Sequence, residues 1–129
     1  MMTIRIRPTD AELAILQVLW DRGPSTVRQV HNALSTAQHT GYTTTLKLMQ
    51  IMARKGLVTR DQSERTHVYA AQLGRGETQR QLVTDLLDRA FGGSAAALVM
   101  QALRAQPASE QEMAEIQRMI REARKERGQ

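Results

Sequence analysis

The segment GYTTTLKLMQIMARKGLVTRDQSERTHVYAA, residues 41–71, determines the expected fold. Residues 42–55 have helical spacing, and Gly56 follows as the expected C-cap. At about 100° per residue, one side of this helix collects Thr45, Leu48, Met49 and Met52. Residues 57–71 then alternate, carry β-branched side chains and have a polar tip at Ser63 and Glu64. The segment therefore predicts a helix followed by a β-hairpin.

Two further helices are expected before this segment. Thr9 with Glu12 forms a capping box, and the helix that it opens runs to Trp20 before Gly23 and Pro24 stop it. Ser25 is the expected cap of a second helix, which ends near Ser35 and is followed by a polar linker from Thr36 to Gly41. The inward positions of this second helix are Val27, Val30 and Leu34.

The C-terminal part reads as three helices with narrow apolar stripes. They are expected at residues 77–91, at 94–104 and after a capping box of Ser109 with Glu112, with breaks at 92–93 and Pro107. Stripes this narrow make a thin core in one chain, so we expect a two-fold partner to cover them. The alternative is a compact monomer in which these helices fold back on the first domain. The expected dimerisation residues are Leu82, Leu86, Leu87, Phe91, Leu98, Leu103, Met113, Ile116 and Ile120.

Three helices followed by a hairpin is the order of a winged helix-turn-helix. We expect a mainly α protein in which this winged helix occupies residues 1–74. A helical dimerisation domain would occupy residues 75–129.

Charge is distributed unevenly along the chain. Its formal net charge is +5, yet residues 22–60 contain no Asp or Glu and six Arg or Lys residues. The outer side of the third helix carries hydrogen-bonding and cationic groups with no carboxylate: Thr43, Lys47, Gln50 and Arg54. Such groups suit base edges and phosphates of double-stranded DNA, although an ordinary solvated helix face is the plain alternative. The candidate DNA contacts are Tyr42, Thr43, Thr44, Lys47, Gln50, Arg54, Lys55, Arg60, Arg65, Thr66 and His67.

Composition argues against several other classes. The chain has no cysteine, only 3% aromatic residues, and no apolar run of the roughly 18 residues that a membrane span needs. Its beginning does not resemble a secretory signal, so we expect a cytoplasmic protein without membrane insertion. The three histidines lack companions at ligand spacing, and His31 is better explained as a packed or surface residue. We expect no metal site, no cofactor and no catalytic residues, and therefore no enzyme.

At three places the sequence resembles the BlaI/MecI/CopY family of bacterial repressors, also called penicillinase repressors. The matching motifs are TVRQVHNAL, GYTTTLKLMQIMARKGLVTRD and ERTHVYAA, and the likeness extends over nearly the whole length. The resemblance implies a homodimeric transcriptional repressor that binds a palindromic operator at a resistance or stress gene, such as one for a β-lactamase. It also implies a membrane metalloprotease receptor, encoded nearby, that triggers cleavage of the repressor.

The chain departs from the family pattern in three ways. It lacks the cysteine-rich hook of the copper-responsive members, and Ile51 stands where staphylococcal members have Arg. The segment that matches their cleavage site contains Met100, Gln101 and Ala102, with Gln–Ala in place of Asn–Phe. These three residues are the candidate proteolytic switch.

The residues and the resemblance together favour a repressor that acts by occluding a promoter. The alternative is a protein-interaction adaptor that uses the winged helix as a docking platform. DNA binding should weaken steeply with salt, whereas adaptor binding should respond less.

Overall fold

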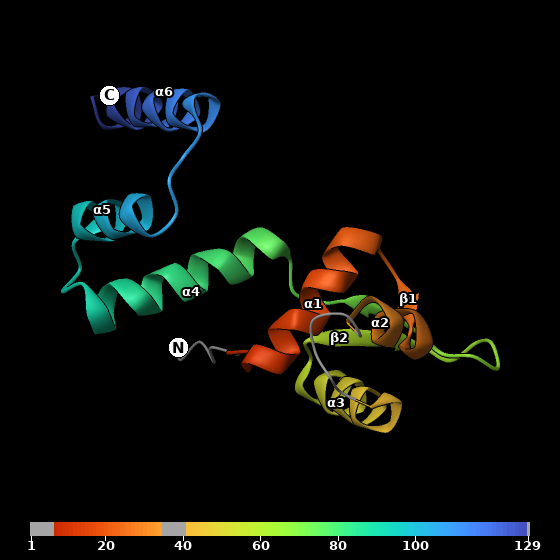
Figure 1. The fold of residues 1–129 in the computed structure, drawn as a ribbon. Helices are drawn as coiled ribbons and strands as arrows, with labels where there is room; N and C mark the ends of the chain where they lie inside the picture. The colour runs from red at the N-terminus through yellow and green to blue at the C-terminus, as the bar shows by residue number, and fades with distance from the viewer. Residues whose placement is uncertain (1–6, 35–40, 129) are drawn as a thin grey trace. The chain divides into compact units, whose positions relative to one another are not determined.

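The computed structural model describes residues 7–34 and 41–128 (Figure 1). The elements are α1 (Asp10–Arg22), β1 (Ser25–Thr26), α2 (Val27–Leu34), α3 (Tyr42–Lys55), β2 (Val58–Asp61), β3 (Val68–Ala71), α4 (Arg75–Ala90), α5 (Ala95–Ala105) and α6 (Glu110–Arg127). The expected mainly α class, with three helices and a hairpin first and helices after, is confirmed. The chain divides into two compact units, residues 1–83 and 84–129. The expected domain boundary lies at residue 74, just before α4 begins at Arg75. Because α4 is continuous across residue 83, we keep this boundary as a proposal.

The ends of α1 follow directly from local sequence. The Thr9 hydroxyl accepts a hydrogen bond from the Glu12 backbone N–H (3.2 Å), and Glu12 Oε1 accepts one from the Thr9 backbone N–H (2.9 Å). These two bonds form the predicted capping box and satisfy N–H groups that the first turn leaves free. At the other end Gly23 adopts φ +87° and donates its N–H to the Leu19 carbonyl.

The predicted cap of α2 at Ser25 is wrong by one residue. Thr26 is the cap: its hydroxyl accepts from the Gln29 N–H (3.1 Å), and Gln29 Oε1 accepts from the Thr26 N–H (2.9 Å). Ser25 is buried and pairs with Tyr69 in the sheet, and its hydroxyl donates to the Gly23 carbonyl. The Ser25 hydroxyl is thus bonded to the preceding loop and not to the first turn of α2, whereas Thr26, also in β1, makes both cap bonds. The expected helix end near Ser35 and the linker over 36–40 lie outside the described residues.

A three-stranded antiparallel sheet joins the hairpin to the start of α2. Its strand order is β1–β3–β2, with Thr26 opposite Val68 and Arg60 opposite Tyr69. The predicted hairpin is therefore confirmed, while β1 was not expected. Gly56, with φ +85°, ends α3 in the left-handed conformation that glycine adopts without strain.

The core of the first unit gathers the apolar sides of α1, α2 and α3 against the hairpin. Its buried hydrophobic residues are Ile15, Leu16, Leu19, Val27, Val30, Met49, Met52, Leu57, Val58 and Tyr69. Thr45 is buried beside them, whereas Leu48 is half-buried at the edge. The expected inner side of α3 is thus present, and α3 is held with its other side toward solvent.

The first turn of α4 belongs to the first unit. The helix begins at Arg75, two residues earlier than expected, and Thr78 donates its hydroxyl hydrogen bond to the Gly74 carbonyl (2.8 Å). Arg75 forms an ion pair with Asp21 at the end of α1, and its guanidinium lies 5.7 Å from the Trp20 ring centroid.

The helices of the second unit have no buried core of their own. Neither α5 nor α6 contains a buried residue. Ser109 caps α6, as expected, and Ser94 caps α5; the hydroxyl of each accepts from the backbone N–H three residues ahead. Large apolar side chains are 38–54% exposed on α4, α5 and α6, among them Leu86, Val99, Met113 and Ile120.

An ion pair between a buried carboxylate and an exposed lysine links the start of α1 to the end of α3. Glu12 is 2% exposed, and its Oε2 accepts a hydrogen bond from Lys55 Nζ at 2.8 Å. Burial alone raises the pKa of Glu12, but the Lys55 and Thr9 hydrogen bonds and the Lys55 charge together outweigh burial. The pKa therefore lies below its ordinary value of 4.5, and folding is stabilised by the charged form.

We predict that Glu12→Gln lowers the free energy of unfolding by about 1.5 kcal/mol near neutral pH, because Gln keeps the cap but loses the charged hydrogen bond. Since the folded pKa is lowered, the contribution is complete above pH 4.5 and is lost as pH falls through the folded value. Urea titrations followed by Trp20 fluorescence, repeated at several pH values, measure this. The exposed Glu64→Gln is the control, and an equal loss at all pH values would refute the ion-pair explanation.

Candidate nucleic-acid interface

The outer side of α3 is exposed and free of carboxylates. Thr43, Thr44, Lys47 and Arg54 are exposed, and Gln50 is half-buried. The helix begins after Gly41, which supplies no side-chain cap. The first turn therefore has N–H groups that no side chain at the cap position satisfies, next to two threonine hydroxyls, a combination that suits a phosphate oxygen.

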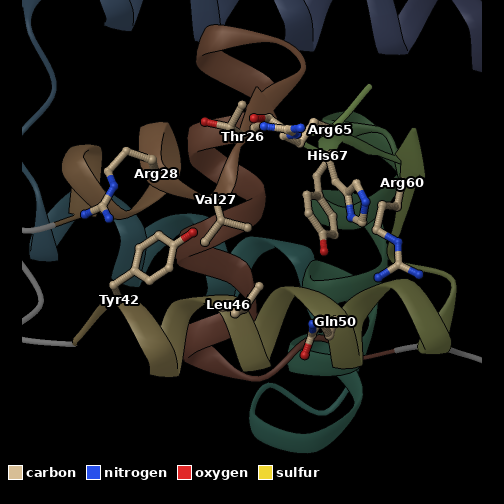
Figure 2. A pocket seen from close by; sticks show the side chains of 11 residues that line it. Thr26, Val27, Arg28, Tyr42, Leu46, Gln50, Arg60, Arg65 and His67 are labelled. Carbon is tan, nitrogen blue, oxygen red and sulfur yellow. The ribbon is translucent and has the colours of Figure 1, made fainter. Parts of the chain in front are cut away.

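Two hollows lie between α3 and the hairpin. We call the hairpin (residues 57–71) the wing. One, of about 300 Å³, lies between α3, the wing and the start of α2 (Figure 2). Gln50 and Arg60 also line a second hollow of about 420 Å³, with Ala53 and Arg54. The residues that line the first, which we call the α3–wing hollow, are Thr26, Val27, Arg28, Tyr42, Leu46, Gln50, Arg60, Arg65, Thr66, His67 and Tyr69. The structure thus brings together six of the predicted DNA contacts.

The charge around these hollows is of one sign. Arg28, Arg60 and Arg65 line the α3–wing hollow, and Arg54 lines its neighbour. No carboxylate is among the described residues that line either hollow. In the amide orientation that satisfies both side chains, the Gln62 oxygen accepts from Arg60 Nε (2.8 Å) and Nη2 (2.6 Å). Arranged in this way, the guanidinium groups attract a polyanion.

The wing carries two acids, Asp61 and Glu64, of which Asp61 takes part in the turn. Its carboxylate accepts a hydrogen bond from the Ser63 backbone N–H (2.9 Å). The Ser63 backbone and side chain hold the pKa of Asp61 below its usual range, so the group stays ionised.

Tyr42 packs between two side chains of α2. The Arg28 guanidinium carbon lies 4.2 Å from the centroid of its ring, and the His31 ring meets it edge-on at 5.9 Å. This packing agrees with the expectation that His31 is a packed residue. Sequence reasoning missed Arg28 and Thr26 as residues of the site, and the only signal for Arg28 was its place in the acid-free stretch.

Lys55, predicted to contact DNA, is engaged within the fold. Its Nζ is paired with Glu12, and it lines neither hollow. The two partners are far apart in the chain, so the pairing leaves no local signal. We therefore assign Lys55 first to the ion pair, and its contact with DNA stays a prediction.

The predicted dimerisation residues lie on the apolar sides of α4, α5 and α6. Leu82, Leu87, Phe91, Leu98, Leu103 and Ile116 are half-buried, whereas Leu86, Met113 and Ile120 are exposed. The candidate switch residues Met100, Gln101 and Ala102 are exposed within α5.

Two other kinds of site receive no support from the described part of the chain. Over residues 7–34 and 41–128, no group of three or more His, Cys, Asp or Glu residues is placed to hold a metal ion. None of the helices in these ranges has the length and apolar character needed to cross a membrane.

Comparison with known proteins points to one family. The family model described as penicillinase repressor matches residues 8–122. The chain is 43% identical over 93 residues to "Transcriptional regulator BlaI" of Mycobacterium tuberculosis, strains CDC 1551 and H37Rv, which covers 70% of this chain and 67% of that relative.

Solved structures show the same fold. The solution structure of the DNA binding domain of the repressor BlaI matches with a TM-score of 0.51 and 21% identity, over 59% of this chain and 93% of that one. A MarR family protein from Bacillus stearothermophilus matches with a TM-score of 0.50 and 24% identity, and the match covers 94% of this chain and 76% of that one. The first match confirms the winged helix fold.

We predict that Arg65→Ala weakens binding to duplex DNA of any sequence, because an exposed wing arginine meets phosphate and not base. The slope of log K against log salt should fall by about one unit. Fluorescence anisotropy with one arbitrary duplex, titrated at several salt concentrations, measures the slope. An unchanged slope would contradict the assignment of the wing to the DNA interface.

Proposed function

This chain belongs to the penicillinase repressor family and is a DNA-binding transcriptional repressor, and we propose that it acts as a homodimer on a palindromic promoter operator. The observation that carries the proposal is the exposed, carboxylate-free side of α3 next to a basic wing. Bound over a promoter, such a dimer represses by excluding the transcription machinery.

In this proposal α3 enters the major groove and reads bases. Gln50 can pair with the edge of an adenine, Lys47 can reach guanine acceptors, and the threonine methyl groups suit thymine. Gln50 is half-buried and lines both hollows, so it lies on the side of α3 that is next to the wing. This makes Gln50 the best candidate for a residue that distinguishes bases.

Backbone contacts would hold α3 in the groove. Thr43 and Thr44 offer hydroxyl and N–H donors at the start of the helix, while Arg60, Arg65 and Thr66 offer donors from the wing. These groups fix register and supply salt-dependent affinity without sequence information.

The second unit would supply the two-fold symmetry. Large apolar side chains on its helices are 38–54% exposed, and neither α5 nor α6 contains a buried residue. A second copy of the chain would bury these side chains. A symmetric dimer places two α3 helices on two half-sites, which matches an inverted repeat.

Regulation is proposed from the family resemblance. The regulated gene would be a resistance or stress gene, such as one for a β-lactamase, and a membrane metalloprotease receptor would act upstream. Met100, Gln101 and Ala102 are exposed, and a cut there would release α6 while leaving α3 and the wing intact. A cytoplasmic location stays a prediction.

We predict that Gln50→Ala relaxes base preference at one position and costs about 1–3 kcal/mol on preferred DNA. The preferred duplex is enriched from a random pool by the unaltered chain, and anisotropy compares it with a scrambled duplex. Lys125→Ala, at the exposed end of α6, is the control. If Gln50→Ala leaves the affinity for the preferred duplex unchanged, the reading side of α3 is misassigned.

We predict that Ile120→Glu converts the dimer into monomers, because a charge would have to be buried in the interface. Ile120 is 49% exposed in one chain, so the fold of the monomer should survive. Gln111→Glu, nine residues earlier and so on the opposite side of α6, is the matched control. Analytical ultracentrifugation decides, and a dimer that persists in Ile120→Glu contradicts the assignment of this stripe.

A further inference from the structure

Arg28 lines the α3–wing hollow but has no role in the DNA contacts proposed above for α3 and the wing. It is exposed, it comes from the first turn of α2, and its guanidinium carbon lies 4.2 Å from the Tyr42 ring centroid. Figure 2 shows the two side chains beside each other at one end of the hollow, with Arg60, Arg65 and His67 across from them.

Contact with an aromatic face leaves a guanidinium able to bind an anion. The ring occupies one side of the planar group and attracts its charge, while the N–H donors at the edge stay available. The side chain is also held in place, so less conformational entropy is lost when it binds. No carboxylate lines this hollow among the described residues, so the charge is not neutralised there.

The hollow lies where a DNA strand must pass. When α3 occupies the major groove and the wing lies along the neighbouring backbone, one sugar–phosphate strand runs between them. The α3–wing hollow separates these same two elements, and Arg28 and Arg65 line it from different elements.

We propose that Arg28 binds a backbone phosphate of this strand and that Tyr42 is its positioning residue. The inference rests on the proposed function. It extends the interface from α3 and the wing to α2, and it gives Tyr42 a role through Arg28 in place of a direct DNA contact. The His31 ring, also on α2, packs edge-on against the Tyr42 ring at a centroid distance of 5.9 Å and helps to hold it in place.

The test uses the full chain and one arbitrary 30-base-pair duplex, because a phosphate contact does not depend on sequence. Arg28→Met should lower the slope of log K against log salt by about 0.9, whereas Arg28→Lys should keep the slope. Arg104→Met, an exposed site on α5 with the same change in net charge, should leave the slope unchanged. Thermal unfolding of each variant verifies that the fold is intact.

The role of Tyr42 is tested by a double-mutant cycle. Tyr42→Leu removes the ring and keeps the arginine, so it should weaken binding, and adding it to Arg28→Met should cause no further loss. Losses that add would show that Tyr42 contacts DNA independently of Arg28, which overturns the positioning role.

The two proposals fail in different ways. If the unaltered chain binds the duplex with a steep salt dependence and Arg28→Met keeps the full slope, the Arg28 inference is wrong while the DNA-binding function stands. A loss confined to the preferred sequence would show a base contact and would also overturn it. If the unaltered chain shows no salt-dependent binding, the proposed function itself fails.

Discussion

Burial of one side of α3 is the constraint on which the rest of this structure depends. Thr45, Met49 and Met52 are buried against the core, and this fixes which residues of the helix face solvent. Because buried and exposed positions alternate at helical spacing, Lys47 and Arg54 are exposed on the other side. The Glu12–Lys55 pair holds the end of the helix, and the Arg28–Tyr42–His31 cluster holds its start. A helix held in this way can make specific contacts because its backbone need not be ordered on binding.

Local signals predicted most of the fold. The capping box at Thr9, the left-handed Gly56 and the alternation around the wing tip each act within a few residues, and the structure has all three. Features that depend on distant partners were missed. Ser25 looked like a cap, but it is buried in the sheet and its hydroxyl donates to the Gly23 carbonyl, while Thr26 makes the cap bonds with Gln29. The Lys55–Glu12 ion pair was missed because Glu12, far away in sequence, gives no local sign of its partner.

The candidate site shows the same division. The helical spacing of α3 predicted its exposed polar side, since exposure follows from periodicity once the core side is known. Arg28 could not be assigned in this way, because its importance comes from the packing of α2 on α3 and from a hollow built by three separate elements. In the second unit, apolar periodicity predicted stripes, and the exposed side chains on α4, α5 and α6 agree with those stripes.

The most direct test of the account is to map the DNA-binding surface residue by residue. A duplex enriched from a random pool is titrated into the isotope-labelled full chain, and backbone amide shifts are followed by NMR. We predict that the largest changes fall in residues 26–28, 42–54 and 60–67, with α5 little affected. Large changes confined to α5 and α6, with α3 unaltered, would contradict it.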